Sequence, residues 1–198
     1  MQIGSLGAGE VALAFARYAL RAGHQILLSN SRGPGSLAST VAELGTGAKA
    51  VTPQEACGAP VVLLAVPWIK VGSVLKTVPP WNGQILVDTT NHFLPSMELA
   101  NLDNRISSEI VAELAPGARI VKALNSIYMS RFSEGPRVGS GRRVLFVSGD
   151  DGAAKRSVAE LLEEFGFSTI DLGGLHEGGR AQQIGNGLAG PDLVEIVP

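Results

Sequence analysis

The sequence predicts an α/β protein with a doubly wound, mostly parallel sheet. Short apolar segments alternate with helical patterns along most of the 198 residues, which is typical of strands joined by crossover helices. The segment 60–66, PVVLLAV, is almost entirely apolar, as expected for a strand covered by helices on both faces. A glycine-rich turn, residues 7–12, follows the first predicted strand. We expect one domain over residues 1–172 and a small irregular segment over 173–198.

The predicted elements follow one another in regular order. Apolar runs bounded by turn residues predict strands over 1–6, 24–30, 60–66, 84–90, 118–124, 142–149 and 167–172. Helical periodicity predicts helices over 11–22, 36–44 and 151–165, and Gly23 ends the first of them. Thr52, Pro53 and Glu55 predict a short helix start with a capping box. The Gly-rich stretch after Leu172 matches no regular element.

Composition limits the classes of function. The chain is 45% hydrophobic and 17% charged with a net charge of −2, which suits one substantial core and argues against nucleic-acid or anionic-membrane partners. A single cysteine, Cys57, excludes an internal disulfide and fits a reducing compartment. The sequence shows neither a signal-peptide pattern nor an apolar run of 18 residues, so we expect a soluble cytoplasmic protein. The three histidines are far apart, and no metal site is expected.

The turn "GAGEVA", residues 7–12, fits the fingerprint G-x-G-x-x-G/A between a strand and a helix. Gly7 allows the tight turn, Gly9 lets a pyrophosphate approach the backbone, and the small Ala12 lets the helix pack against the strand. The helix N-terminus offers free N–H groups to the phosphates. These features predict dinucleotide binding on a Rossmann-type fold. Glu10 adds negative charge there, so we expect its side chain to turn toward solvent.

The polar run after the second strand, Asn30-Ser31-Arg32, bears on the choice of dinucleotide. An acid at this place hydrogen-bonds the 2′-hydroxyl of NAD and repels a 2′-phosphate. Arg32 instead offers a charge-assisted fork to phosphate, and Asn30 and Ser31 can donate hydrogen bonds. The alternative is a solvated arginine in a polar turn. Together with the glycine-rich turn, these residues favour NADP over NAD.

The order and spacing of several motifs over residues 1–172 resemble one known family. The motifs are GAGEVA, SNSRGP, AVPW, VDTTN, IVKALNSI and SGDDGAAKRSVAELLEEFGF. In this combination the chain resembles the NADPH-dependent coenzyme F420 reductases, a group with many bacterial dinucleotide-binding homologues. It is also similar to the oxidoreductase domain of the STEAP metalloreductases. It departs from the pattern at Asn125, which is histidine in archaeal F420-using members.

The resemblance implies hydride transfer between NADP(H) and a deazaflavin (F420) or flavin acceptor, in a homodimer. It places residues 8–11 at the pyrophosphate, Ser31 and Arg32 at the 2′-phosphate, and residues 65–67 at the middle of the cofactor. It places Asn91 and His92 near the nicotinamide ribose, and Asn125 with Ile127 beside the nicotinamide and the acceptor ring. The full set of expected cofactor-binding residues is Gly7, Ala8, Gly9, Glu10, Val11, Asn30, Ser31, Arg32, Ala65, Val66, Pro67, Lys70, Asn91, His92, Ala123 and Asn125.

Direct hydride transfer between two cofactor rings needs position and electrostatics rather than a protein nucleophile, so no catalytic residue is predicted. Two alternatives stay open: an NADPH-sensing module without turnover, and a small NADP-dependent dehydrogenase of a carbonyl substrate. Leu175, Ile184, Leu188 and Leu193 give the C-terminal segment an apolar character. We expect this segment to pack across a two-fold partner and help to close the acceptor site.

Overall fold

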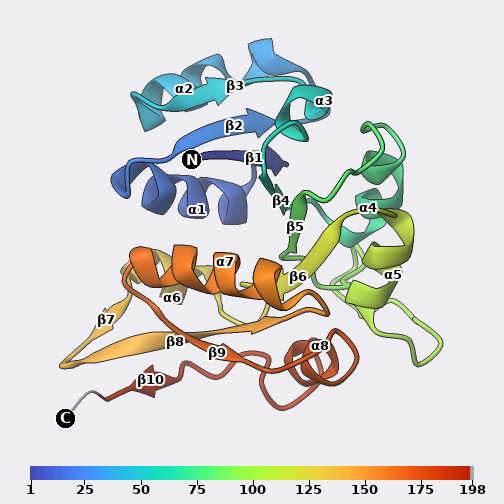
Figure 1. Ribbon diagram of the computed structural model, residues 1–198, viewed down its shortest axis with the longest axis vertical. Helices are drawn as coiled ribbons and strands as arrows, with labels where there is room; N and C mark the ends of the chain where they lie inside the picture. The colour runs from blue at the N-terminus through green and yellow to red at the C-terminus, as the bar shows by residue number, and fades with distance from the viewer. Residues whose placement is uncertain (197–198) are drawn as a thin grey trace.

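A ten-stranded sheet covered by helices on both faces forms the centre of the computed structural model, which describes residues 1–196 (Figure 1). The strands are β1 (Gln2–Leu6), β2 (Gln25–Ser29), β3 (Ala48–Ala50), β4 (Val61–Leu64), β5 (Ile85–Asp88), β6 (Arg119–Ala123), β7 (Arg137–Val138), β8 (Gly141–Ser148), β9 (Ser168–Asp171) and β10 (Val194–Glu195). The helices are α1 (Glu10–Arg21), the 3₁₀ helix η1 (Pro34–Leu37), α2 (Ala38–Leu44), α3 (Pro53–Ala56), α4 (Trp68–Leu75), α5 (Ser107–Leu114), α6 (Met129–Glu134), α7 (Gly152–Glu164) and α8 (Glu177–Gln182). None of those helices has both the length and the hydropathy needed to cross a bilayer.

The strand order confirms the doubly wound fold. Six parallel strands run in the order β3-β2-β1-β4-β5-β6, so the order reverses between β1 and β4. In such sheets ligands bind at the carboxyl ends of the strands, next to this reversal. β8 departs from the parallel arrangement, because a tight hairpin with β7 turns the chain and β8 then pairs antiparallel with β6.

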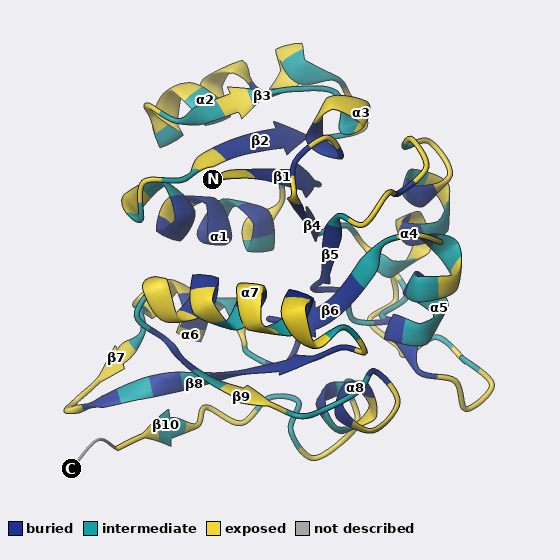
Figure 2. Cartoon of the chain, viewed as in Figure 1, coloured by how far each residue is buried: buried dark blue, intermediate teal, exposed yellow. Residues whose placement is uncertain are grey.

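Alternating side chains of the strands supply the two halves of the core. Along β4, Val61 and Leu63 pack toward α1 and α7, whereas Val62 and Leu64 pack toward α4 and α5. The strands at the centre are buried, while the outer faces of the helices are exposed (Figure 2). This two-sided burial explains the unbroken apolar runs in the sequence.

The C-terminal segment is more regular than its glycine content predicts. It contains α8 and the short strand β10, and both lie on the sheet of their own chain, where β10 pairs with β8 and Leu175 joins the core. A Cβ on Gly178 would lie 2.6 Å from the carbonyl oxygen of Leu172 and 2.7 Å from the Cβ of Ser148. Glycine therefore lets α8 approach the sheet closely. Glycine content alone suggested an irregular segment, because sequence does not reveal such close packing.

Helices α4, α5 and α6 were also absent from the sequence prediction. Each spans eight residues or fewer, so its periodicity is short. Tertiary packing decides them instead: α4 buries Val71 and Leu75, α5 buries Val111, and α6 buries Phe132.

Candidate cofactor and acceptor site

Glycine stands at positions 7 and 9 of the β1–α1 turn for different structural reasons. Gly7 has a φ of +115°, and a Cβ there would lie 2.0 Å from the carbonyl oxygen of Ala65. Gly9 is the N-cap residue of α1, and a Cβ there would meet no atom within 4 Å. Packing therefore demands Gly7, whereas Gly9 leaves open space beside the N-terminus of α1.

Two cavities open on either side of Gly9. The β2-side cavity, of about 630 Å³, lies against the ends of β1 and β2 and against α3 and α4. The β5-side cavity, of about 560 Å³, lies against the start of α1, the start of α4 and the loop after β5. They share Gly9, Ala65, Val66 and Pro67, which we call the waist. The two cavities thus form one elongated site at the carboxyl edge of the parallel strands.

The loop after β2 shapes one end of the β2-side cavity. The Asn30 side chain accepts a hydrogen bond from the backbone N–H of Arg32 (2.9 Å) and donates one to the Ser36 hydroxyl (2.9 Å). These bonds hold the turn, so Asn30 acts on its own loop. Ser31 and Gly33 line the cavity, and the exposed Arg32 lies between them.

Helices α3 and α4 form the opposite wall of the β2-side cavity. The capping box predicted for Thr52 and Glu55 is confirmed at the start of α3. Gln54 donates a hydrogen bond of 2.8 Å to the carbonyl oxygen of Thr77, which joins α3 to the end of α4. Among the residues that line this cavity, all within the described chain, only Lys70 carries a charge. The cavity therefore contains no acid that would repel a phosphate.

The walls of the β5-side cavity are mainly apolar. Glu10, Thr89, Thr90 and Asn91 supply its polar side chains, and Glu10 is exposed, as expected. Its apolar lining consists of Val11, Ala65, Val66, Pro67, Trp68, Ile69, Phe93, Leu94, Pro95 and Met97. This combination suits a flat, largely apolar ring with a few hydrogen-bonding groups.

A fully buried ion pair between Lys122 and Asp88 lies behind Thr90, which lines the β5-side cavity. Lys122 Nζ lies 3.0 Å from Asp88 Oδ2 and donates a hydrogen bond of 2.6 Å to the carbonyl oxygen of Thr90. Asp88 Oδ1 accepts hydrogen bonds from the N–H (2.9 Å) and the hydroxyl (2.7 Å) of Thr90. Buried charges of this kind are tolerated when every partner is satisfied. The pair fixes the backbone of Thr90 at the cavity.

Three of the expected site residues lie behind the cavity walls. His92 is buried with its ring 6.4 Å from that of Trp68, and burial, followed by the charge of Lys122, lowers the pKa of His92. Ala123 is part of the core under α1. Asn125 is buried, and its side chain bonds to Asn91 and Gln182.

The structure gathers most of the expected residues along the elongated site. The β2-side cavity is lined by Gly7, Ala8, Gly9, Asn30, Ser31, Ala65, Val66, Pro67 and Lys70. The β5-side cavity adds Glu10, Val11 and Asn91. Arg32, His92, Ala123 and Asn125 are absent from both linings. Within residues 1–196, no group of three or more His, Cys, Asp or Glu side chains is placed to hold a metal ion.

Sequence reasoning missed the walls that come from distant segments. These residues are Thr52, Gln54, Ser73 and Thr77 at the β2-side cavity and Trp68, Phe93, Leu94 and Met97 at the β5-side cavity. The capping box marked α3 as a helix, and AVPW marked the end of β4. Neither pattern indicates which cavity the following residues face.

Comparisons with known proteins agree with this geometry. The family model described as "NADP oxidoreductase coenzyme F420-dependent" matches residues 2–92. A solved structure from Arthrobacter sp. FB24, described as an F420-dependent NADP reductase, is 27% identical, with a TM-score of 0.76 over 92% of this chain and 89% of that one. Residues 2–92 therefore match the F420-dependent NADP oxidoreductase family, and the rest of the chain resembles a relative described in the same terms.

Two further relatives differ in how much of their own length this chain covers. A hypothetical protein from Sinorhizobium meliloti is 40% identical, with a TM-score of 0.91 over 98% of this chain and 96% of that one. The metalloreductase STEAP3 of Rattus norvegicus is 31% identical over 176 residues, which are 88% of this chain and 34% of STEAP3. The chain thus spans about a third of the length of this curated relative.

Proposed function

We propose that the protein transfers a hydride between NADP(H) and a flat ring acceptor of the deazaflavin (F420) or flavin type. The observation that carries the proposal is the waist that joins the two cavities. It places open space at Gly9, beside the N-terminus of α1, where a pyrophosphate would meet free N–H groups. The adenosine half then occupies the β2-side cavity, and the nicotinamide half occupies the β5-side cavity.

The residues after β2 support NADP over NAD. Ser31 lines the β2-side cavity, Arg32 is exposed beside it, and Lys70 adds a second positive charge across the cavity. A 2′-phosphate on the adenosine ribose would gain charge-assisted hydrogen bonds there. NAD, with a hydroxyl at that position, would gain none of this charge attraction.

The lining of the β5-side cavity supports a ring acceptor. A small carboxylate substrate would need a converging arginine or lysine, and the lining of this cavity contains neither. The apolar side chains of Val66, Trp68 and Phe93 instead suit a planar ring stacked near the nicotinamide. The Arthrobacter relative, described as an F420-dependent NADP reductase, is consistent with this acceptor class.

We also propose that two copies pair at the mouth of the β5-side cavity. Ile69 and Met97 line this cavity and remain 49% and 70% exposed. A second copy would cover these side chains and narrow the opening. Light scattering of the protein at micromolar concentration should give the mass of a dimer, and Met97→Glu should give a monomer. A monomer before mutation would overturn this arrangement.

Cofactor choice is tested by calorimetry with NADPH and NADH. One charge-assisted hydrogen bond contributes about 1.5–3 kcal/mol, so NADPH should bind on the order of 10- to 100-fold more tightly. Arg32→Ala should remove most of this difference and leave NADH binding unchanged. Arg17→Ala, a change of an exposed arginine on α1, is the matched control and should retain the preference. Equal affinities for the two cofactors in the unmutated protein would overturn the choice of NADP.

The acceptor is tested by mixing the protein and NADPH separately with F420, FMN, FAD and small carbonyl compounds. We expect loss of nicotinamide absorbance with F420 or a flavin. Oxidation of NADPH with carbonyl compounds alone would show that the acceptor is a carbonyl compound and not F420 or a flavin. Tight NADPH binding without oxidation by any of them would favour an NADPH-sensing role.

A further inference from the structure

We propose that Gln182 is a positioning residue that controls the β5-side cavity from α8. It holds Asn125, and through Asn125 it holds the side-chain amide of Asn91 at the cavity wall. The inference rests on the proposed function only for the identity of the ligand, the nicotinamide riboside half of NADP(H). It gives the C-terminal segment, which no sequence motif explained, a role in hydride transfer.

Gln182 is fully buried and bonds to two strands of the sheet. Its Oε1 accepts a hydrogen bond from the Ser148 hydroxyl of β8 (2.9 Å), and its Nε2 donates to Asn125 Oδ1 (2.9 Å). Its backbone carbonyl oxygen accepts a hydrogen bond of 2.6 Å from Asn125 Nδ2. Asn125 is therefore held from two directions by one residue of α8.

Asn125 has no amide hydrogen left for a ligand. Its two Nδ2 hydrogens go to the backbone oxygen of Gln182 and to Asn91 Oδ1 (3.2 Å). The preceding residue, Leu124, has a φ of +63°, a strained conformation for a branched side chain. The chain turns sharply after β6 and presents Asn125 to α8, so Asn125 transmits a position and does not contact the acceptor.

Asn91 is the member of this amide chain that lines the cavity. Its Nδ2 donates to the backbone oxygen of Asn125 (2.8 Å), and its Oδ1 accepts from Asn125 Nδ2. Two bonds to one neighbour fix the plane of the amide. One Nδ2 hydrogen and one Oδ1 lone pair remain, which match the hydroxyl groups of a ribose or the carboxamide of nicotinamide.

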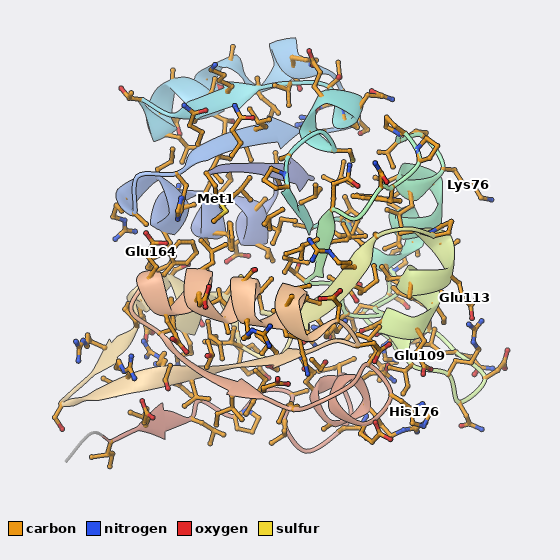
Figure 3. All side chains as sticks on the ribbon, in the orientation of Figure 1. Met1, Lys76, Glu109, Glu113, Glu164 and His176 are labelled. Atoms are coloured by element: carbon orange, nitrogen blue, oxygen red, sulfur yellow. The ribbon has the colours of Figure 1, made fainter. Side chains whose placement is uncertain are left out.

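Helix α8 is itself anchored to α5 at both of its ends, through its N-cap residue His176 and its C-cap residue Gln183. Gln183 Oε1 accepts a hydrogen bond of 2.7 Å from the backbone N–H of Ser107 at the start of α5. The ring of His176 lies 3.0 Å from Glu109 of α5, and Figure 3 shows these two labelled side chains next to each other. With Gly178 packed against β8, these contacts make α8 a fixed support for Gln182.

Removing the Gln182 side chain should therefore affect one end of the site only. In Gln182→Ala, Asn125 keeps its bond to the backbone oxygen at position 182 but loses the donor to its Oδ1. The amide of Asn125 is then less constrained, so the amide of Asn91 loses its fixed plane and one hydrogen bond to the ligand weakens. We expect NADP⁺ to bind about tenfold more weakly and hydride transfer to slow about tenfold or more. Adenosine 2′,5′-bisphosphate, which fills only the β2-side cavity, should bind with an unchanged Kd.

A double-mutant cycle distinguishes positioning from general loosening of the fold. Asn91→Ala should reproduce the effects of Gln182→Ala, and the double variant should be no weaker than Asn91→Ala alone. Gln84→Ala is the matched control, since it removes a glutamine side chain that bonds to the backbone of Asn82 and Cys57, away from α8 and from the amide chain. If Gln182→Ala does not fold, Gln182→Glu replaces it, because Glu keeps the acceptor for Ser148 and loses the donor to Asn125.

The Kd values of NADP⁺ and of adenosine 2′,5′-bisphosphate, measured by calorimetry, test the role of Gln182 without any measurement of catalytic turnover. Additive effects of Gln182→Ala and Asn91→Ala on the binding of NADP⁺ would overturn the inference. Equal weakening of the binding of NADP⁺ and of the bisphosphate by Gln182→Ala would also overturn it. A protein that binds NADP⁺ but reduces no acceptor would overturn the proposed function alone, and the binding cycle would still decide the role of Gln182. Failure to bind NADP⁺ at all would overturn both.

Discussion

Replacing Gly9 by Val tests whether the cofactor crosses the waist. A Cβ on Gly9 meets nothing within 4 Å, and the backbone there is extended (φ −87°, ψ −169°), so the fold accepts a branched residue. The cost is the less favourable N-cap of α1, about 1 kcal/mol. In a chain of this length, that lowers the melting temperature by about 2–4 °C.

Binding should respond much more strongly than stability. The valine side chain would occupy the space where the pyrophosphate meets the N-terminus of α1. Losing two charge-assisted hydrogen bonds to phosphate costs about 3–6 kcal/mol, which is on the order of 100-fold or more in Kd. Calorimetry with NADPH measures the Kd, and calorimetric melting of the unliganded variant measures its stability.

Gly7→Ala provides the contrast. Its new Cβ would lie 2.0 Å from the carbonyl oxygen of Ala65, at a φ of +115°. Backbone strain of about 1–3 kcal/mol and overpacking of about 1–3 kcal/mol should lower the melting temperature by on the order of 10 °C. An unchanged NADPH affinity in Gly9→Val would refute the waist as the cofactor path. Equal destabilisation by both substitutions would refute the packing argument.

Three further predictions concern buried polar groups. Lys122→Met should lower the free energy of unfolding, measured in urea, by about 3–5 kcal/mol, because it leaves Asp88 charged and unpaired in the interior. A loss below about 1 kcal/mol would contradict the role of the ion pair in fixing the backbone of Thr90. Burial and the charge of Lys122 lower the pKa of His92 in the native state, whereas in the unfolded chain histidine accepts a proton below a pKa of about 6.5. The free energy of unfolding should therefore fall from pH 7.5 to pH 5, and His92→Phe should make this fall smaller. Burial raises the pKa of the Cys57 thiol to about 12, so a thiol reagent at pH 8 should label the protein only in denaturant, and rapid labelling of the native protein would contradict this burial.

The sequence alone determined the features that depend on neighbours along the chain. Strands covered on both faces require unbroken apolar runs such as 60–66, and the turn at 7–12 needs glycine wherever a side chain would clash or block a ligand. Both signals are local. They therefore predicted the doubly wound sheet, the β1–α1 turn and the polar end of β2.

Tertiary structure alone decided which side chains meet across the sheet. Strand periodicity does not fix the face of the sheet on which Lys122 lies. The pairing of β5 with β6 places it opposite Asp88, which binds it. Gln182 lies in a Gly-rich segment, and its partners are 34 and 57 positions away in the chain. Contacts over such separations depend on strand order and on the close approach that Gly178 permits, and no periodicity in the sequence encodes them.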